Sequence, residues 1–189
     1  MVAPWPSAHA AGLDFAASAW SRAAHDHGLD PALLYALTLV ESRRSLDEDR
    51  IGPWPWVIRT PRDSYWFESR ARARKGLKAV LAEWPAKRVD VGAAQVNVGW
   101  HRARFDRPAQ LLDLETNLGV AAAILADAIA STPDTVVGVG LYHHWGDAAR
   151  SRHYGQRVWW TYRAITFGQA NPAGRFSRPG PALGAVAAR

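Results

Sequence analysis

Glu41 is the residue whose setting is least usual for its type. It follows Leu34 by seven positions and Leu37 by four, so on a helix the three side chains share one face, which points to the interior or a cleft. A carboxyl group removed from water favours its protonated form, so its pKa rises toward the value that a proton donor needs at neutral pH. General acids that cleave glycosidic bonds have this property. The alternative is a solvated glutamate paired with Arg43 or Arg44, because most helical glutamates are exposed.

The other residue types that support catalysis form no recognisable group. The chain has no cysteine, no Gly-rich phosphate loop and no nucleophilic triad. His143 and His144 are adjacent, so they cannot both face one site on a helix, and no acidic residue stands at metal-ligand spacing from them. We therefore expect neither a metal ion nor another cofactor.

The elements that would position Glu41 are mainly helices. Asp30 and Pro31 are typical of a helix start, and apolar residues at helical spacing continue that helix to residue 41. Gly28 suits the left-handed turn that ends a preceding helix over residues 13–27. The remaining predicted helices cover residues 68–84, residues 116–131 with Thr116 as the cap, residues 133–142 and residues 147–167.

Between these helices the sequence predicts extended segments and loops. Residues 45–63 lack a helical period, and their Pro and Trp residues favour an extended strand. A turn over residues 60–64 leads into Tyr65-Trp66-Phe67, so this insert should form a small hairpin or an ordered aromatic loop. We expect a Gly-containing loop over residues 89–100 and a helical turn over residues 108–112. The predicted fold class is mainly α, with a small β-hairpin or extended insert.

Length, composition and charge limit the classes of partner. The 189 residues suffice for one domain with a substantial core, and no apolar run approaches the roughly 20 residues of a membrane-spanning helix. The formal charge of +6 favours an acidic partner such as nucleic acid, an anionic membrane surface or a wall polymer with carboxylates. Ten tryptophans offer flat faces for sugar rings or bases, and they also pack in cores.

Composition divides the chain into three parts. Ala8-His9-Ala10 has the small-x-small pattern of a signal-peptidase site, so we expect residues 1–12 to follow a removed export signal. Residues 13–168 are the predicted folded domain. Residues 169–189 are rich in Pro, Gly and Ala with few large apolar side chains, which predicts a disordered tail.

One motif contains Glu41 and a second lies further along the chain. A Gly-x-x-Pro start over residues 28–31 leads to the pair Glu41-Ser42 at the end of a helix. Gly92-Ala93-Ala94-Gln95, followed by Val96-Asn97, is similar to a Gly-Leu-Met-Gln loop. Together they resemble the catalytic domain of the soluble lytic transglycosylases, a branch of the lysozyme-like superfamily.

Two later motifs extend this resemblance in the family's order. Asn117 opens a long helix after a Leu-x-Asp turn, and Leu141-Tyr142-His143 stands where many members have Ala-Tyr-Asn. The resemblance covers residues 13–167. The basic, Trp-rich insert over residues 45–88 looks like the branch found in conjugative and integrating elements.

The resemblance implies a goose-type lysozyme-like helical domain that acts on bacterial peptidoglycan. Glu41 would be the single general acid and base that cleaves between N-acetylmuramic acid and N-acetylglucosamine and leaves an anhydromuramyl end. It implies substrate contacts from five further residues: Ser42, Gln95, Asn97, Tyr142 and His143. For these residues helix capping, core packing and loop hydrogen bonding stay open as structural alternatives.

The resemblance also implies a location and partners. We expect a periplasmic monomer that binds peptidoglycan glycan strands, with a type IV secretion or conjugation apparatus as a further candidate partner, and no nucleic acid. Asp63 is the nearest second carboxylate by analogy with lysozyme, but its place in a predicted turn explains it structurally. Two other functions remain open: a non-catalytic glycan-binding or assembly module, and a nucleic-acid binder based on the basic segment over residues 70–88.

Overall fold

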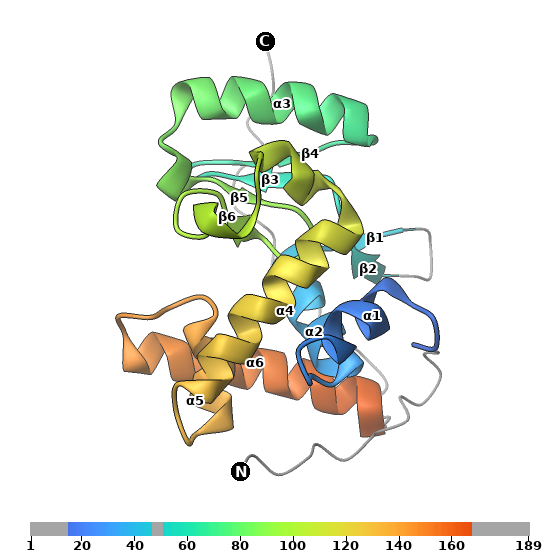
Figure 1. Ribbon diagram of the computed structural model, residues 1–189, viewed down its shortest axis with the longest axis vertical. Coiled ribbons are helices and arrows are strands. Elements are labelled where there is room, and N and C mark those ends of the chain that lie inside the picture. The colour runs from blue at the N-terminus through green and yellow to red at the C-terminus, as the bar shows by residue number, and fades with distance from the viewer. Residues whose placement is uncertain (1–14, 47–50, 168–189) are drawn as a thin grey trace.

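The fold is mainly helical, as predicted, with two small antiparallel sheets (Figure 1). The computed structural model describes residues 15–46 and 51–167. The described residues contain six α-helices: α1 Ala19–His25, α2 Pro31–Ser42, α3 Arg70–Glu83, α4 Leu114–Ala130, α5 Thr135–Leu141 and α6 Ala148–Phe167. The expected N-terminal segment (1–12) and C-terminal tail (169–189) lie outside the described residues.

The insert after α2 forms strands, as its sequence predicts. Two short strands, β1 (Arg43–Ser45) and β2 (Ile51–Pro53), pair directly after α2. A second sheet has the order β4-β3-β5-β6, with β3 at Val57–Arg59 and β4 at Ser64–Trp66. The turn predicted over residues 60–64 joins β3 to β4, so the expected hairpin is confirmed.

The expectation of a plain loop over residues 89–100 was wrong. This segment contains β5 (Asp90–Val91) and β6 (Val96–Asn97), which pair with each other, while β5 also pairs with β3. Two-residue strands are too short to show an alternating pattern. Their existence depends on the long-range pairing of Ile58 with Val91, which no local signal reveals.

Helix α1 is shorter than predicted. It begins at Ala19 rather than at residue 13, because Ala17 has a positive φ of 58° and Ser18 caps the helix by accepting the amide of Ser21 at 3.0 Å. The predicted left-handed turn is confirmed, since Gly28 has a φ of 65°.

The start of α4 also differs from the prediction. The helical turn expected at residues 108–112 is confirmed as the 3-10 helix η3 (Pro108–Leu112). Asp113 follows it and caps α4, because its Oδ1 accepts the amide of Thr116 at 3.1 Å. Asp113 is therefore the N-cap residue of α4, and Thr116, which was predicted to be the cap, donates its backbone amide to it.

One hydrophobic cluster includes residues of all six helices and of the larger sheet. Figure 1 shows α4 running from the sheet and α3 at one end of the molecule to α5 and α6 at the other. Leu34 and Leu37 of α2 are fully buried in this cluster. Their burial confirms that the helix face shared with Glu41 points inward.

Helices α2 and α6 run antiparallel and are tied at both ends. The Asp30 carboxylate accepts the Ala32 amide at 2.8 Å, which caps α2, and it also accepts the Tyr162 hydroxyl at 2.8 Å. At the other end of α2, Glu41 accepts a hydrogen bond from Tyr154, eight residues before Tyr162 on α6. These two bonds set the position of Glu41 relative to α6.

Candidate active site

Glu41 lies in the last turn of α2, where it is sheltered from bulk water but borders a pocket. The residue is 4 % exposed, and the pocket has a volume of about 470 Å³. Val40, Arg59, His143 and Tyr154 line the pocket with it. The sequence-based expectation that Glu41 faces the interior or a cleft is confirmed.

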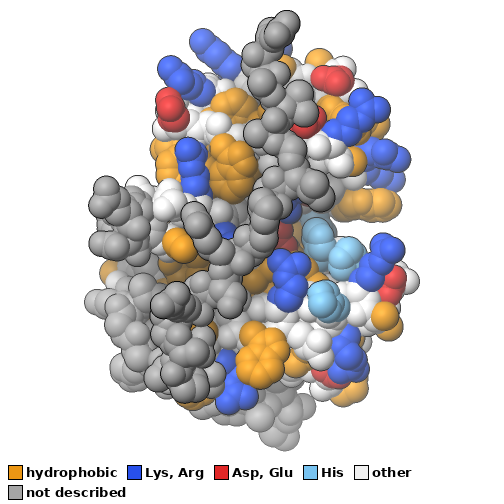
Figure 2. Space-filling view, turned by 180° about the vertical axis from the view of Figure 1, so that it is seen from behind, with side chains coloured by type: hydrophobic (Ala, Val, Ile, Leu, Met, Phe, Trp, Pro, Cys, Tyr) orange, Lys and Arg blue, Asp and Glu red, His pale blue; other side chains and the backbone are white. Residues whose placement is uncertain are grey.

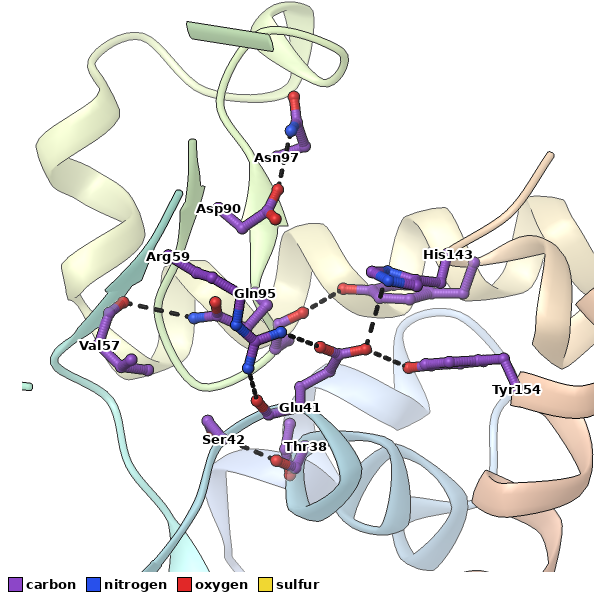
Figure 3. Close-up of polar contacts among 12 residues, drawn as sticks. Thr38, Glu41, Ser42, Val57, Arg59, Asp90, Gln95, Asn97, His143 and Tyr154 are labelled. Carbon is purple, nitrogen blue, oxygen red and sulfur yellow. Dashed lines mark hydrogen bonds and ion pairs between the residues drawn. The ribbon is translucent and has the colours of Figure 1, made fainter. Parts of the chain in front are cut away.

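Three side chains surround the Glu41 carboxylate (Figure 3). The Tyr154 hydroxyl donates to Oε1, Arg59 Nη1 lies 3.5 Å from Oε2, and His143 Nδ1 lies 4.0 Å from Oε1. Arg59 Nη2 also donates to the Glu41 carbonyl oxygen at 2.8 Å, so the arginine fixes both the backbone and the side chain. A strand, a turn and a helix therefore converge on one carboxyl group.

Burial raises the pKa of Glu41, while the His143 ring, the Tyr154 hydroxyl and the Arg59 guanidinium oppose that rise. The charge of Asp90 adds a small upward contribution, and the net pKa stays above that of a solvated glutamate. The carboxyl group therefore keeps its proton at a higher pH than usual. Once the proton has left, the three neighbouring groups stabilise the anion. Burial thus stabilises the protonated carboxyl group, and its polar neighbours stabilise the carboxylate.

Replacing Glu41 with Gln should stabilise the fold at neutral pH. The carboxyl loses its proton at lower pH in the unfolded chain than in the folded protein, since burial raises the folded pKa. Its ionisation therefore destabilises the fold, and this penalty grows as pH rises from the unfolded pKa through the folded one. We expect thermal melts near neutral pH to show a higher midpoint for the variant; at this chain length each 1 kcal/mol of stability corresponds to about 2–4 °C. At about pH 4, where the unfolded carboxyl is mostly protonated, we expect no gain; an equal gain at both pH values would contradict a raised pKa.

The turn between β5 and β6 follows Asp90 and is held by Asn117 of α4. Asn117 accepts the Ala94 amide at 2.8 Å and donates to the carbonyl oxygens of Val91 and Leu111 at 2.9 and 3.1 Å. Gly92 has a φ of 85°, and a Cβ at this position would lie 2.3 Å from the Asn117 amide nitrogen. Only glycine fits the close approach of this turn to α4.

Ser42 and Tyr142, which were expected near Glu41 or the substrate, both bond to the same turn. The Ser42 hydroxyl lies 2.6 Å from the Ala93 carbonyl oxygen and accepts the Trp54 amide at 3.2 Å. The buried Tyr142 hydroxyl donates to the Ala94 carbonyl oxygen at 2.8 Å. These hydroxyls hold the turn in place; no hydrogen bond joins either of them to the Glu41 carboxylate among the described residues.

Gln95 is buried and has the left-handed φ of 49°. Its amide nitrogen donates to the Gly92 carbonyl oxygen at 2.8 Å and lies 3.4 Å from the Val57 carbonyl oxygen. Its side-chain oxygen is buried and has no hydrogen-bond partner in the described part of the chain. The amide nitrogen of Gln95 thus stabilises the loop, while its side-chain oxygen accepts no hydrogen bond from the described residues.

The side-chain polar atoms of Asn97, which was expected to contact the substrate, form hydrogen bonds within the protein. Its amide nitrogen donates to Asp90 Oδ1 at 2.8 Å and to the Lys87 carbonyl oxygen at 3.1 Å. Its oxygen accepts the amides of Gly99 and Trp100. The side chain orders the segment after β6 and positions the Asp90 carboxylate (Figure 3).

His143 lies at the site as expected, and His144 lies there too, although two adjacent residues could not share one site on a helix. Both line the pocket, because residues 142–147 form a turn after α5 instead of continuing the helix. Their rings contact each other with centroids 4.5 Å apart, and His143 stacks on Tyr154 at 5.1 Å. No group of three metal-ligating side chains occurs within residues 15–46 and 51–167.

Sequence reasoning missed several pocket residues, most of them on α6. Arg150, His153, Tyr154 and Arg157 recur at positions i, i+3, i+4 and i+7, so they share one helix face. This polar stripe was visible in the predicted helix over residues 147–167. Arg59 carried no comparable signal, because an arginine at the end of a strand is usually solvent-exposed.

Comparison with known proteins identifies no relative. No protein-family model, no curated protein and no solved structure matches the chain. Among the described residues no helix is both long and apolar enough to span a membrane. The function is therefore argued from the site and from the motifs that form it.

Proposed function

We propose that the protein is a peptidoglycan lytic transglycosylase with Glu41 as its single general acid and base. The observation that carries the proposal is the buried Glu41 carboxyl, which has a raised pKa, borders a pocket and is surrounded by Tyr154, Arg59 and His143. The motif resemblance adds support, because the turn over residues 92–95 and Asn117 contact each other beside Glu41. The finer assignment of the mainly helical fold as goose-type lysozyme-like belongs to the same proposal.

In the first step the protonated Glu41 donates its proton to the glycosidic oxygen. The bond from the muramyl C1 to this oxygen breaks, and N-acetylglucosamine leaves as an alcohol. The N-acetyl group of the muramyl sugar stabilises the positive charge that develops at C1, so a second protein carboxylate is not needed. Glu41 is left ionised, and Tyr154, His143 and Arg59 stabilise its negative charge.

In the second step the Glu41 carboxylate takes the proton of the muramyl sugar's own primary hydroxyl. The oxygen of this hydroxyl bonds to C1 and closes the anhydro ring, and Glu41 is protonated again. No water is consumed. A site that stabilises both protonation states of one carboxyl group suits a residue that acts first as an acid and then as a base.

Mass analysis of the products tests this proposal. We expect the purified protein to release muropeptides with anhydromuramyl ends from isolated sacculi. Products that carry the mass of one added water would indicate hydrolysis. Sacculi that bind the protein but release nothing would favour the non-catalytic glycan-binding or assembly module, and DNA binding with a steep salt dependence would favour the nucleic-acid binder.

Hydrolysis is a second candidate because of Asp90, a carboxylate that sequence reasoning missed. Burial raises the pKa of Asp90, and Asn97 holds one of its oxygens at 2.8 Å. Its charge also raises the pKa of Glu41, so the two carboxyl groups influence each other. Glycosidases with two carboxylates use the second one to activate water or to attack the sugar. Asp63, by contrast, lies exposed in the β3–β4 turn.

Location and partners are part of the same proposal. A peptidoglycan-cleaving enzyme of this kind acts in the periplasm on glycan strands. The positive charge of the chain suits a wall polymer that carries carboxylates. A conjugation or type IV secretion apparatus is a further candidate partner.

Replacing Tyr154 with Phe should move the alkaline limb of the pH–rate profile to higher pH. The Tyr154 hydroxyl lowers the pKa of Glu41, so without it the acid stays protonated to higher pH. The same bond stabilises the anion after proton transfer, so we expect the rate itself to fall about tenfold. Initial rates of sacculus solubilisation across the pH range measure both effects.

Tyr162→Phe is the matched control for this variant. It removes a buried hydroxyl from the same helix, but one that donates to Asp30 at the far end of α2. We expect the control to lower thermal stability without moving the alkaline limb. A limb that stays in place in Tyr154→Phe would contradict the role given to Tyr154.

A further inference from the structure

The pocket beside Glu41 has one acidic residue and many cationic or imidazole side chains in its lining. Arg59 contacts Glu41 with its side chain. The other basic side chains of the lining lie on the wall formed by the turn after α5 and by α6. This wall, here called the basic wall, comprises His143, His144, Arg150, His153 and Arg157. Figure 2 shows histidine side chains gathered on this face with Lys and Arg side chains around them.

Much of the basic wall is not neutralised by the protein itself. Arg150 contacts Asp147 at 3.2 Å, but Arg157 and His153 have no ion-pair partner among the described residues. By contrast, Arg152 on another face of α6 pairs with Asp134 at 3.0 Å. The unpaired cation thus lies on the face of α6 that lines the pocket.

We infer that the basic wall binds a carboxylate carried by the muramyl sugar next to the bond that Glu41 cleaves. This inference rests on the proposed function. N-acetylglucosamine has no charge, whereas the muramyl unit carries an acidic substituent, either its own lactyl carboxylate in peptide-free strands or the carboxylates of an attached peptide. Guanidinium and imidazole groups donate hydrogen bonds to carboxylates, and Arg does so with both nitrogens of its fork.

The shared pocket gives this wall a role in selecting the substrate. A sugar ring that presents its glycosidic oxygen to Glu41 places its substituents within the same cavity of about 470 Å³. A polymer of N-acetylglucosamine alone would fill the pocket with neutral groups and leave Arg157 without a partner. The wall therefore distinguishes peptidoglycan from an uncharged glycan such as chitin.

Titration calorimetry with three probes of equal length tests the inference. Glu41→Gln serves as the background so that no probe is cleaved. The probes are an N-acetylglucosamine oligosaccharide, a peptide-free muramyl oligosaccharide with lactyl carboxylates, and the same oligosaccharide with its peptides. We expect one or both muramyl probes to bind about tenfold more tightly than the uncharged probe, with a preference that weakens as salt is added. The muramyl probe that binds more tightly identifies the source of the carboxylate.

The second variant in the same background is Arg157→Gln, with Arg152→Gln as the matched control. Both remove one positive charge from α6, but only Arg157 lines the pocket. We expect Arg157→Gln to abolish most of the preference for the carboxylated probe and Arg152→Gln to keep it; circular dichroism checks that both fold. Equal affinity for all three probes, or an unchanged preference in Arg157→Gln, would overturn the inference. Failure of the proposed function is recognised separately, as wild-type protein that binds sacculi without releasing anhydromuropeptides.

Discussion

Replacing Glu41 with Gln should lower the rate of glycan cleavage by about 10³-fold or more, since in the proposed mechanism this one residue is the acid in the first step and the base in the second. The amide keeps the size of the side chain and its contact with Tyr154 but has no proton to give at neutral pH. Release of anhydromuropeptides from sacculi, quantified by mass analysis, measures the loss. Binding to sacculi should persist, because the pocket keeps its shape.

The matched control is Glu83→Gln, which makes the same chemical change in an exposed residue at the end of α3. We expect wild-type cleavage and a wild-type melting curve from this control, and a cooperative melting transition with a raised midpoint from Glu41→Gln. If Glu41→Gln cleaved sacculi at the wild-type rate, the catalytic role of Glu41 would be excluded. If it lost both cleavage and binding, the loss would reflect the pocket rather than the proton.

Replacing Gly155 with Ala should produce a large loss of stability from a single methyl group. A Cβ at Gly155 would lie 1.9 Å from the Val136 carbonyl oxygen, and one at Gly140 would lie 1.7 Å from the Ser151 carbonyl oxygen. The backbones of α5 and α6 touch at these two glycines, so the added carbon meets main chain that cannot move aside. We expect the free energy of unfolding to fall by roughly 3 kcal/mol, the upper range for overpacking, seen in thermal melts as a midpoint lower by about 6–12 °C.

Gly119→Ala is the control of opposite sign. Gly119 lies inside α4, and a Cβ there would meet nothing within 4 Å. Alanine favours a helix over glycine, so this variant should gain about 0.5–1 kcal/mol. A similar change in both variants would show that helix propensity, and not the contact of α5 with α6, governs the effect at Gly155.

The helices that position Glu41 could be predicted because their signals are local. Asp30 and Pro31 start α2 where expected, and Leu34 and Leu37 identify the face that carries Glu41. The β3–β4 hairpin was also predicted, since the turn residues lie beside the strands they join. These features depend on interactions between residues close in the chain.

The rest of the site depends on contacts between residues far apart in the sequence. Asp90 lies in the two-residue strand β5, which pairs with the distant strand β3, and Arg59 reaches Glu41 from that same sheet. Neither carries a local pattern that distinguishes it from a surface residue. The side of α6 that faces the pocket is likewise decided by packing against α2 and α5.

Two residues that were expected to contact the substrate form hydrogen bonds within the protein. Ser42 and Tyr142 were singled out because their types and motif positions suit substrate contact, and both hydroxyls bond to the turn between β5 and β6. Their contact with a substrate stays a prediction. A sequence pattern gives the position of a hydroxyl group, but the hydrogen-bond partner of that group appears only in the folded chain.

The antiparallel helices α2 and α6 are joined by two hydrogen bonds, each from a tyrosine hydroxyl to a carboxylate: Tyr162 to Asp30 and Tyr154 to Glu41. Sliding one helix past the other by a single residue would displace each hydroxyl from its carboxylate by about 1.5 Å and break both hydrogen bonds together. The register of the two helices therefore fixes how far Glu41 lies from the α6 side of the pocket, and the bond between Tyr162 and Asp30 at the far end of α2 helps to hold that register.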